Sequence, residues 1–506
     1  MGRPPIGPKE IAGAKIVFIN MPVRESARPT TTPEGPLLMA TNLIQNYSVD
    51  ASIIDLNAYR PNGKYLSHNE VSQLLKDHIR IHGEPDVVAF SGIITTLRWQ
   101  EAVAKMIREI IPDVFLVSGN GLATELKTGL FNYIPELDAV AHSEGDDVIL
   151  KIIYDAKLIK KRGIKSNGRH RFMYAGGRPK DLDKLPFADL ELIKTDVYGN
   201  PVLQWYLDTP VWGVGANNSS ATSFTMNKST TFVSSRGCPY ACAFCYRGAQ
   251  GERNYGMRSA KNLAAEFRLH IEKYGVDFIG MPDDNFAINH QRIVDLVPLL
   301  KPLNIRWGTH ARLDESAKFP LMAEAGCIYL GFGAESASPS VLRVMKKGIL
   351  NKEIMMKGII ECENAGIHAS CTWIMAYPTE TLEDLKMSVA FIKWQEDFYV
   401  SRGKSADSVN KKMFTATWYP GTEMLNHPKV KRILHEIFGI NFNPTTGEPV
   451  CDENFRQYLL ELDDATKLLH NPKTGEPLNF SDMPMDTFVK AREYIDSGEI
   501  DKILEM

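Results

Sequence analysis

Short apolar runs alternate with segments of helical periodicity in two separate stretches of this sequence. In the first stretch, residues 15–22 (KIVFINMP), 51–57 (ASIIDLN), 87–93 (VVAFSGI) and 114–120 (VFLVSGN) are typical of buried strands, and helical spacing fills the gaps between them. Alternation of this kind predicts a doubly wound parallel sheet, because parallel neighbours are joined by crossover helices. In such a sheet the ligand site lies at the carboxyl ends of the strands.

The second stretch repeats the pattern with six strand-like segments. It starts at residue 229 (STTFVSS) and ends with MFTATWYP after Lys412, and its four middle strands are expected within 276–281, 305–311, 327–335 and 368–377. Helical segments join most of them, which predicts a partial or complete β/α barrel. The loops at the carboxyl face of a barrel carry its function.

These patterns divide the chain into four expected regions. A doubly wound domain at 1–158 and a barrel at 228–425 are separated by a basic linker with several glycines and prolines at 159–227, and a small, charged, mostly helical extension follows at 426–506. The composition, 44% hydrophobic and 24% charged, is that of a globular protein and argues against disorder. A net charge of -3 provides no field that would attract nucleic acid, so none is expected as a partner.

The distribution of cysteines indicates the compartment. Seven cysteines, none before Cys238, make a poor disulfide framework and favour a reducing environment. The N-terminal residues lack the apolar core of a signal peptide, and no apolar stretch is long enough to span a bilayer. We therefore expect a cytoplasmic protein without a membrane partner.

Three of the cysteines form the most specific motif in the sequence. Cys238, Cys242 and Cys245 are spaced C-x3-C-x2-C directly after a predicted strand. Three thiolates on one short loop can bind three irons of a [4Fe–4S] cube and leave the fourth iron open. A structural zinc site would need a fourth ligand close by, and no Cys or His stands at that spacing. Three packed or surface thiols are the remaining alternative.

The cysteine motif, with Phe244 one residue before the last cysteine, resembles that of the radical S-adenosylmethionine (SAM) superfamily. Further resemblances follow in order along the chain: residues 281–286 (MPDDNF), 311–314 (ARLD), 331–336 (GFGAES), 375–381 (MAYPTET) and 418–424 (WYPGTEM). The family's Gly-x-Pro-x-Glu loop has Ala376 in place of its first glycine. The resemblance implies that SAM binds the open iron and is cleaved to methionine and a 5′-deoxyadenosyl radical. It implies SAM contacts at Phe244, Asp283, Asp284, Arg312, Glu335, Ser336 and Pro378.

The N-terminal region resembles the cobalamin-binding domain of class B radical SAM proteins, many of which are methyltransferases. The usual Asp-x-His-x-x-Gly motif is absent, because residues 20–29 (NMPVRESARP) contain no histidine, so the residue below cobalt is not identified. Ordinary strand-end turns are the alternative reading of this region, and His142 is a weaker further candidate. The resemblance implies cobalamin contacts at Ser91, Gly92, Thr95, Thr96, Leu97, Ser118, Gly119, Asn120, Gly121, Glu144 and Gly145.

Together these resemblances imply a cobalamin-dependent radical SAM C-methyltransferase. Such an enzyme methylates an unactivated carbon through a 5′-deoxyadenosyl radical and methylcobalamin, under anaerobic conditions and with an external electron donor such as flavodoxin or ferredoxin. Cys371 and Tyr377, on or after a late barrel strand, are candidates to donate or relay hydrogen. The chain also resembles the glutamine C-methyltransferases that modify methyl-coenzyme M reductase, which would make the substrate a protein or peptide segment.

Other functions stay open at this point. A cobalamin-binding radical SAM cyclase or rearrangement enzyme needs the same cofactors, and a corrinoid or iron–sulfur storage or sensing protein is not excluded. A methylthiotransferase is disfavoured, because its N-terminal domain holds a second cluster on three cysteines and this chain has none there. Natural products, hopanoid-type lipids and tetrapyrroles remain possible substrates.

Overall fold

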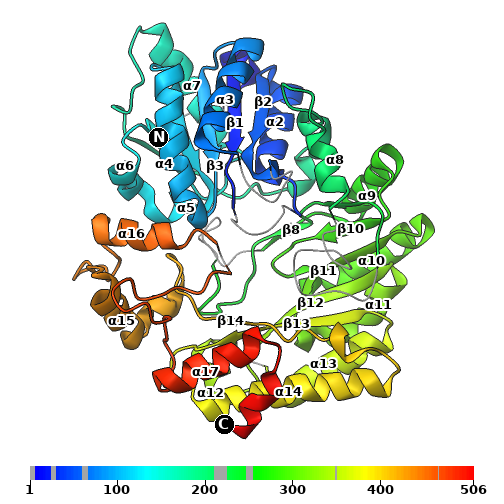
Figure 1. The fold of residues 1–506 in the computed structure, drawn as a ribbon. Helices are drawn as coiled ribbons and strands as arrows, with labels where there is room; N and C mark the ends of the chain where they lie inside the picture. Colours follow the sequence, from blue (N-terminus) through cyan, green and yellow to red (C-terminus); the bar gives the residue numbers. More distant parts are fainter. Residues whose placement is uncertain are drawn as a thin grey trace. The chain divides into compact units, whose positions relative to one another are not determined.

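A computed structural model describes residues 6–23, 30–59, 66–209, 225–246, 255–347, 350–464 and 466–506. The chain divides into two units. The N-terminal unit contains the described chain up to Tyr206 and a later segment, Gly439–Lys467. The barrel unit contains the described parts of Leu207–Tyr246 and Arg253–Phe438, and the final segment, Leu468–Met506. Each unit is built around its own parallel sheet (Figure 1).

Six strands form the sheet of the N-terminal unit, in the order β2-β1-β3-β4-β5-β6. Their bounds are β1 Lys15–Asn20, β2 Asp50–Asp55, β3 Val87–Ser91, β4 Phe115–Gly119, β5 Ala139–His142 and β6 Phe172–Ala175. All neighbours pair in parallel, so the predicted doubly wound sheet is confirmed and the carboxyl ends of its strands share one edge. β3 is buried along its whole length, as expected of an apolar strand in a sheet that is covered on both faces.

Helices connect these strands and flank the sheet (Figure 1). Their bounds are α1 Pro8–Ile11, α2 Glu34–Tyr47, α3 His68–His82, α4 Leu97–Ile110, α5 Asn120–Leu126, α6 Leu130–Tyr133, α7 Val148–Lys161 and α8 Val202–Leu207. α3 shows how the sequence sets both ends of a helix. Ser67 and Glu70 form a reciprocal capping box at its start, and Gly83 ends it with a φ of 83°, a value that favours glycine.

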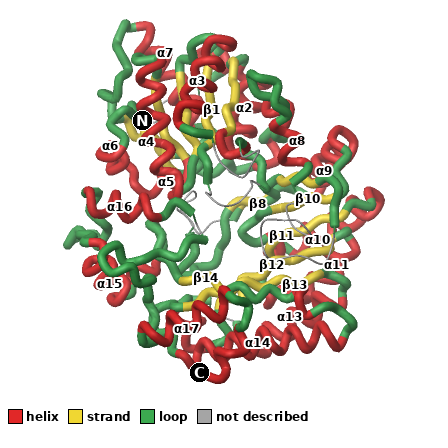
Figure 2. The backbone as a smooth tube through the Cα atoms, viewed as in Figure 1, coloured by secondary structure: helices red, strands yellow, loops and turns green. Residues whose placement is uncertain are grey.

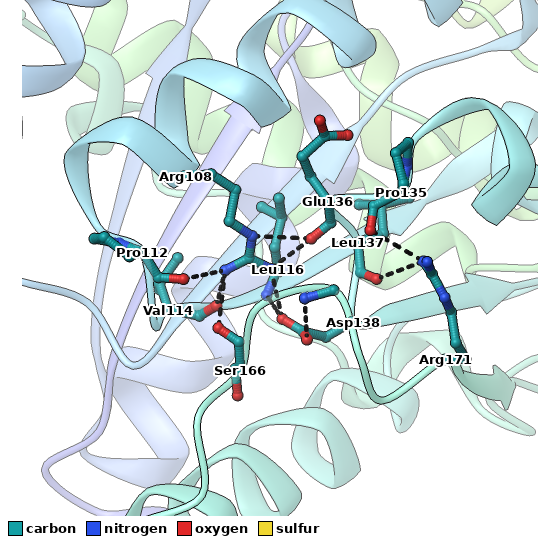
Figure 3. Close-up of polar contacts among 11 residues, drawn as sticks. Arg108, Pro112, Val114, Leu116, Pro135, Glu136, Leu137, Asp138, Ser166 and Arg171 are labelled. Carbon is teal, nitrogen blue, oxygen red and sulfur yellow. Dashed lines mark hydrogen bonds and ion pairs between the residues drawn. The ribbon is translucent and has the colours of Figure 1, made fainter.

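A buried ion pair fastens the amino ends of the strands in this unit. Nη2 of Arg108 lies 2.7 Å from Oδ2 of Asp138, and the side chain of Asp138 is fully buried. The carboxylate of Asp138 also accepts hydrogen bonds from the backbone N–H groups of Leu116 and Gly168. Arg108 donates further hydrogen bonds to the carbonyl oxygens of Pro112, Val114, Glu136 and Ser166 (Figure 3). The pair therefore ties α4, β4, the start of β5 and the segment before β6 together.

The barrel unit contains six parallel strands in the order β14-β13-β12-β11-β10-β7. Their bounds are β7 Ser229–Thr231, β10 Phe278–Met281, β11 Arg306–Ala311, β12 Cys327–Glu335, β13 His368–Met375 and β14 Met413–Thr415, and a small antiparallel pair, β8 Ser235–Arg236 and β9 Gly256–Met257, lies beside them. The outermost strands, β7 and β14, do not pair with each other in the described chain. The prediction of a partial barrel is therefore confirmed.

The barrel unit also contains helices, most of which lie along the outer side of the barrel strands (Figure 2). Their bounds are α9 Ala260–Tyr274, α10 His290–Leu300, α11 Phe319–Glu324, α12 Pro339–Val344, α13 Lys352–Asn364, α14 Leu382–Ser401, α15 Pro428–Phe438 and α17 Met485–Asp496. α9 begins at the N-cap Ser259 and ends at Gly275, as the sequence predicts. None of the helices that the structure describes is both long and apolar enough to cross a membrane.

Alternate residues of the barrel strands face opposite sides of the sheet. Phe332 of β12 packs against Phe319 of α11, and Trp373 of β13 packs against Phe391 of α14, so this face is covered by helices. On the other face, a Cβ added at Gly331 would stand 2.6 Å from the ring of His310. A glycine at that position therefore makes room for the imidazole.

The region after 425 is shared between the two units. Gly439–Lys467, with α16 Glu453–Glu461, belongs to the N-terminal unit, and the remainder belongs to the barrel unit. Nε and Nη2 of Arg456 on α16 donate to the two carboxylate oxygens of Glu101 on α4, at 2.6 and 2.7 Å. The predicted extension at 426–506 thus contributes α16 to the N-terminal unit, and α15 and α17 to the barrel unit.

Two hairpins in this region share the pattern N-P-x-T-G-E-P, at 443–449 and 471–477. Antiparallel bridges close them, one between Phe442 and Pro449 and one between His470 and Pro477. Each turn places its glycine at a positive φ of 70° or 75°, where a side chain would be strained. One copy lies in each unit, so the repeated sequence forms two similar turns and not a separate domain.

Candidate active site

The three predicted cysteine ligands lie on one loop of the barrel unit, directly after β8. We call residues 237–246 the cluster loop. Gly237 has a φ of 82°, a left-handed turn that separates the strand from Cys238. Cys242 is buried, Cys238 and Cys245 are partly buried, and all three thiols are free. The loop therefore presents three unpaired sulfur atoms in the barrel unit.

The thiols influence one another electrostatically. Burial, together with the charges of Asp284, Cys242 and Cys238, raises the pKa of Cys245 to about 12. Burial also raises the pKa of Cys238, with Asp284 and Cys242 contributing. These mutual effects mean that the thiolates are unfavourable as a group unless a cation compensates them.

The donor set fits an iron–sulfur cube better than a single ion. Within the described ranges, no three Cys, His, Asp or Glu side chains are placed so as to hold one metal ion. A cube takes its thiolates at separate corners, so the ligands need not converge on one point. Three free thiols on one loop match that requirement.

Asp283 anchors the chain just ahead of the cluster loop. Its carboxylate accepts hydrogen bonds from the backbone N–H of Ser234 at 2.7 Å and from the hydroxyl of Ser235 at 2.6 Å, and also from the hydroxyl of Ser234. Arg292 donates to the carbonyl oxygen of Ser234 at 3.1 Å. Asp283 is 1% exposed, so its oxygens are occupied inside the protein, whereas the neighbouring Asp284 is exposed.

Arg312 lies against the cluster loop from the end of β11. Its guanidinium carbon is 3.9 Å from the centre of the Tyr240 ring, and its Nε donates to Asp314 at 2.9 Å. A cation over an aromatic face is attracted by the ring's quadrupole. The contact therefore holds the part of the loop between Cys238 and Cys242.

Glu335 and Ser336 stand at the end of β12, in the order that the sequence predicts. Glu335 has a φ of 64° and forms an ion pair with Lys347. The hydroxyl of Ser336 lies 3.3 Å from that of Ser388 on α14 and accepts a hydrogen bond from the backbone N–H of Ser338. The strand end is thus fixed by two separate polar contacts.

The loop after β13 contains Pro378 and comes close to the cluster loop. Tyr377 is buried, and its ring packs edge-on against Phe244 with 6.4 Å between the ring centres. Burial raises the pKa of the Tyr377 hydroxyl, and Cys242 contributes. Ala376 has a φ of 59°, and its backbone N–H donates to Glu380 at 2.5 Å. The glycine that the family motif would have at position 376 is thus replaced by an alanine held in a glycine-like conformation.

Cys371 lies on a different side of the sheet from the cluster loop residues. It shares a face of β13 with Trp373, which packs against α14, so its side chain points toward the helices. Burial raises the pKa of its thiol to about 12 and Glu335 adds to this shift. The structure therefore brings Tyr377 to the cluster loop but leaves Cys371 in the layer between the sheet and the helices.

In the N-terminal unit, the predicted cobalamin residues gather at the carboxyl edge of the sheet. Asn120 has a φ of 72°, and its side chain donates to the hydroxyl of Ser91 at 3.3 Å, which joins the ends of β4 and β3. Gly92 has no room for a side chain, because an added Cβ would stand 2.8 Å from Nε2 of Gln100 and nearer still to Thr96. Asn120 is exposed and Gly119 is partly exposed at this edge.

Several of the predicted cobalamin residues form hydrogen bonds within the N-terminal unit. Ser118 donates to Gln100 at 2.7 Å, and Gln100 donates to Thr96 at 3.1 Å, in a buried chain of hydrogen bonds. The hydroxyl of Thr95 donates to the carbonyl oxygen of Val23 at 3.0 Å. Thr96, Leu97 and Ser118 are fully buried, and Gly121 is buried. These residues shape the edge rather than form its surface.

Glu144 and Gly145 follow β5 at the same edge. The carboxylate of Glu144 accepts a hydrogen bond from Nε of Arg178 at 3.1 Å, and both side chains are about nine-tenths buried. Gly145 packs against Met39, whose sulfur would lie 2.9 Å from an added Cβ. Burial lowers the pKa of the nearby His142, with Lys127 contributing, so its imidazole is neutral at physiological pH.

Four residues at the cluster loop escaped the sequence analysis: Lys347, Tyr240, Ser234 and Ser235. Tyr240 was visible inside the cysteine motif, where an aromatic residue between two ligands was a usable signal. No sequence signal marks Lys347, because it stands in the ordinary polar sequence MKKG after α12. Its position depends on how the chain returns from that helix.

Comparison with known families places the cluster loop in a recognised domain. The model of the radical SAM superfamily matches residues 232–392. An uncharacterized methyltransferase of Pyrococcus horikoshii is 26% identical over 438 residues, which cover 83% of this chain and 84% of the relative. The anaerobic magnesium-protoporphyrin IX monomethyl ester cyclase of Rubrivivax gelatinosus is 24% identical over 351 residues, which cover 66% of this chain and 57% of the cyclase.

Solved structures share the fold. The cobalamin-dependent SAM radical enzyme OxsB, with aqua-cobalamin and SAM bound, superposes with a TM-score of 0.66 at 16% identity, over 96% of this chain and 67% of OxsB. The radical SAM methyltransferase TsrM of Kitasatospora setae gives a TM-score of 0.56 at 14% identity, over 97% of this chain and 89% of TsrM. Residues 232–392 thus match a radical SAM domain, and the chain shares its fold with these two solved structures.

Proposed function

We propose that this chain is a cobalamin-dependent radical SAM C-methyltransferase that places a methyl group derived from SAM on an unactivated carbon. One observation carries the proposal. Three free thiols, Cys238, Cys242 and Cys245, lie on one loop of a radical SAM half-barrel, in a chain that also has a doubly wound unit with polar residues at its carboxyl edge. When bound, the cluster with SAM supplies a radical that removes hydrogen, and the corrinoid supplies the methyl group.

The three thiols would hold the cluster, and the residues around the cluster loop would bind SAM. Asp283 acts through Ser234 and Ser235, because its own oxygens are occupied. The other proposed SAM contacts are Phe244, Asp284, Arg312, Glu335, Ser336 and Pro378. The buried position of Tyr377 against Phe244 favours a part in closing this site to water, which protects a radical from side reactions.

The corrinoid would lie at the carboxyl edge of the N-terminal unit. Gly119, Asn120 and Gly145 are partly or fully exposed there, and Glu144 would contribute from its buried pair with Arg178. Ser91, Gly92, Thr95, Thr96, Leu97, Ser118 and Gly121 would shape the turns behind them. OxsB and TsrM are described with cobalamin bound, which supports the same cofactor here.

The reaction also needs an electron from outside the chain, and a flavodoxin or ferredoxin is the proposed donor. For the acceptor, the resemblance to glutamine C-methyltransferases makes a glutamine within a protein segment the first candidate. Tetrapyrroles are the second, because relatives in Chlorobaculum tepidum and Rubrivivax gelatinosus are named for them.

Methyl transfer from labelled SAM tests the proposal. The anaerobically reconstituted chain, with reductant and SAM labelled on its methyl group, is offered a glutamine-containing peptide panel and a tetrapyrrole panel. Label in an acceptor, together with 5′-deoxyadenosine, supports the proposal, and both products should vanish in Cys242→Ala. SAM cleavage that persists in Cys242→Ala would overturn the cluster assignment.

A cyclase is the second candidate, because two of the curated relatives are named as anaerobic cyclases. A cyclase would form 5′-deoxyadenosine and convert the acceptor without adding label to it. That outcome would reject methyl transfer while leaving the cluster and the radical chemistry in place.

A further inference from the structure

Two adjacent lysines follow α12 and have opposite surroundings. The side chain of Lys346 is 54% exposed and pairs with Glu423 at 2.6 Å. The side chain of Lys347 is 9% exposed. A lysine is seldom buried unless its charge is paired, so the surroundings of Lys347 call for an explanation.

Its first partner is Glu335 at the end of β12. Nζ of Lys347 lies 3.1 Å from Oε1 of Glu335, and the carboxylate is as deeply buried as the ammonium group. A Cβ at Gly333 would stand 2.9 Å from Nζ and would collide with the carboxylate of Glu335. The glycine therefore makes room for the ion pair. Glu335 itself holds a φ of 64°, which a non-glycine residue keeps only where its surroundings fix it.

Its second partner is the cluster loop. Nζ of Lys347 lies 5.5 Å from the centre of the Phe244 ring. Two residues earlier, the carbonyl oxygen of Met345 accepts a hydrogen bond of 2.9 Å from the backbone N–H of Ala243. A backbone contact and a side-chain contact thus join this segment to Ala243 and Phe244, the two residues between Cys242 and Cys245.

The charge of Lys347 also reaches the thiols. It opposes the burial and the negative charges that raise the pKa of Cys245. Within the protein, Lys347 is paired with the carboxylate of Glu335.

We propose that Lys347 is a positioning residue that joins the end of β12 to the cluster loop and places its ammonium group against Phe244, the residue before Cys245. This inference rests on the proposed function only in assuming that the three thiols hold a cluster. Lys347 has two separate effects, one in the metal-free protein and one in the loaded protein. In the metal-free protein, Lys347 restrains the loop; in the loaded protein, its charge favours the reduced and more negative form of the cluster.

Three single variants separate these roles. Lys347→Met keeps the length of the side chain and removes the charge, Lys347→Arg keeps the charge, and Lys346→Met is the matched control at the exposed neighbour. Because Lys347→Met leaves Glu335 buried and unpaired, a double variant with Glu335→Gln covers the case in which the single variant does not fold.

Hydrogen exchange of residues 238–246 in the metal-free chain is the first readout. We expect exchange about tenfold faster in Lys347→Met than in the wild type, and no change in Lys346→Met, since one cation–π contact and one buried ion pair are lost only in the former. The midpoint potential of the reconstituted cluster, from a redox titration followed by electron paramagnetic resonance, is the second. It should be more negative in Lys347→Met, by about 59 mV for each tenfold shift in this one-electron equilibrium, and near the wild-type value in Lys347→Arg.

The outcomes are distinguishable. If a folded Lys347→Met, or the double variant, matches Lys346→Met in both exchange and potential, the inference is wrong. If the wild type takes up no iron, the proposed function fails, and the exchange of the metal-free loop still decides whether Lys347 restrains it.

Discussion

The guanidinium carbon of Arg312 lies 3.9 Å from the ring centre of Tyr240, the residue midway between the first two cysteines of the cluster loop. Arg312 is 8% exposed, and Asp314 accepts a hydrogen bond from it. The Tyr240 ring therefore packs against a guanidinium group that is held in place. Lys347 makes the corresponding contact with Phe244, between the second and third cysteines. Both intervals of the cysteine motif are therefore fastened by an aromatic residue and a buried cation.

Replacing Tyr240 should weaken the retention of iron. A partly buried cation–π contact is worth about 0.5–2 kcal/mol, or roughly a 2- to 30-fold change in an equilibrium constant. We expect Tyr240→Leu to lose iron faster by this factor in a timed challenge with a chelator. Tyr240→Phe keeps the aromatic face and should behave like the wild type. Equal loss from both variants would show that the hydroxyl, not the ring, matters.

Glu380 should make stability depend on pH in an unusual direction. Burial raises the pKa of its carboxyl from 4.5 to about 8 in the folded protein. Between these values the unfolded chain releases the proton and the folded chain keeps it. The free energy of unfolding therefore falls as the pH rises through this window, by at most about 1.4 kcal/mol per pH unit, and the contribution is fully present below pH 4.5.

Urea unfolding of Glu380→Gln at pH 5 and pH 8 measures this effect. The glutamine cannot ionise and still accepts the hydrogen bond from Ala376, so the variant should gain stability relative to the wild type at pH 8 and little at pH 5. Glu383→Gln, an exposed neighbour, is the control and should keep the wild-type pH dependence. A variant with the same pH dependence as the wild type would show that Glu380 is ionised in the folded protein.

The pair of Arg108 and Asp138 should be a major determinant of stability in the N-terminal unit. Removing one member of a buried pair leaves the other charge uncompensated, which costs about 3–5 kcal/mol. We expect a loss of this size in Arg108→Met, measured by denaturant unfolding followed by circular dichroism. Arg80→Met removes an exposed pair with Asp77 and should cost less than about 1 kcal/mol. Similar losses in the two variants would contradict the role assigned to Asp138.

Gly92 offers a test of the proposed corrinoid edge. A Cβ in Gly92→Ala would collide with Thr96 and press on Gln100, so the turn after β3 must shift, at a cost of about 1–3 kcal/mol. We expect corrinoid retention to fall while iron retention does not change. Gly35→Ala, where an added Cβ meets open space, is the control. Unchanged corrinoid retention in Gly92→Ala would argue against this edge as the site.

The architecture could be predicted because local hydrophobic patterns in the sequence indicate its strands and helices. The predicted runs at 87–93 and 114–120 contain β3 and β4 of one parallel sheet, and the run at 327–335 is the barrel strand β12. The cysteine loop followed from its spacing alone. Phe244 and Tyr377, predicted separately, meet in the structure because two loops at the same end of the barrel strands carry them.

What the sequence could not supply depends on long-range packing. The assignment of Gly439–Lys467 to the N-terminal unit rests on contacts such as Arg456 with Glu101, residues 355 positions apart. The burial of Lys347 arises from the return of the chain after α12, which no pattern in MKKG encodes. The orientation of Cys371, by contrast, was within reach, since it shares its face of β13 with Trp373, an obvious core residue.

The content of iron and corrinoid per chain, after anaerobic reconstitution and removal of unbound material, tests the central claim most directly. The account predicts one [4Fe–4S] cluster and one corrinoid per chain in the wild type, and corrinoid without the cluster in Cys242→Ala. Iron without corrinoid in the wild type would contradict the proposed function of the N-terminal unit, and a full complement of iron in Cys242→Ala would contradict the assignment of the cluster loop.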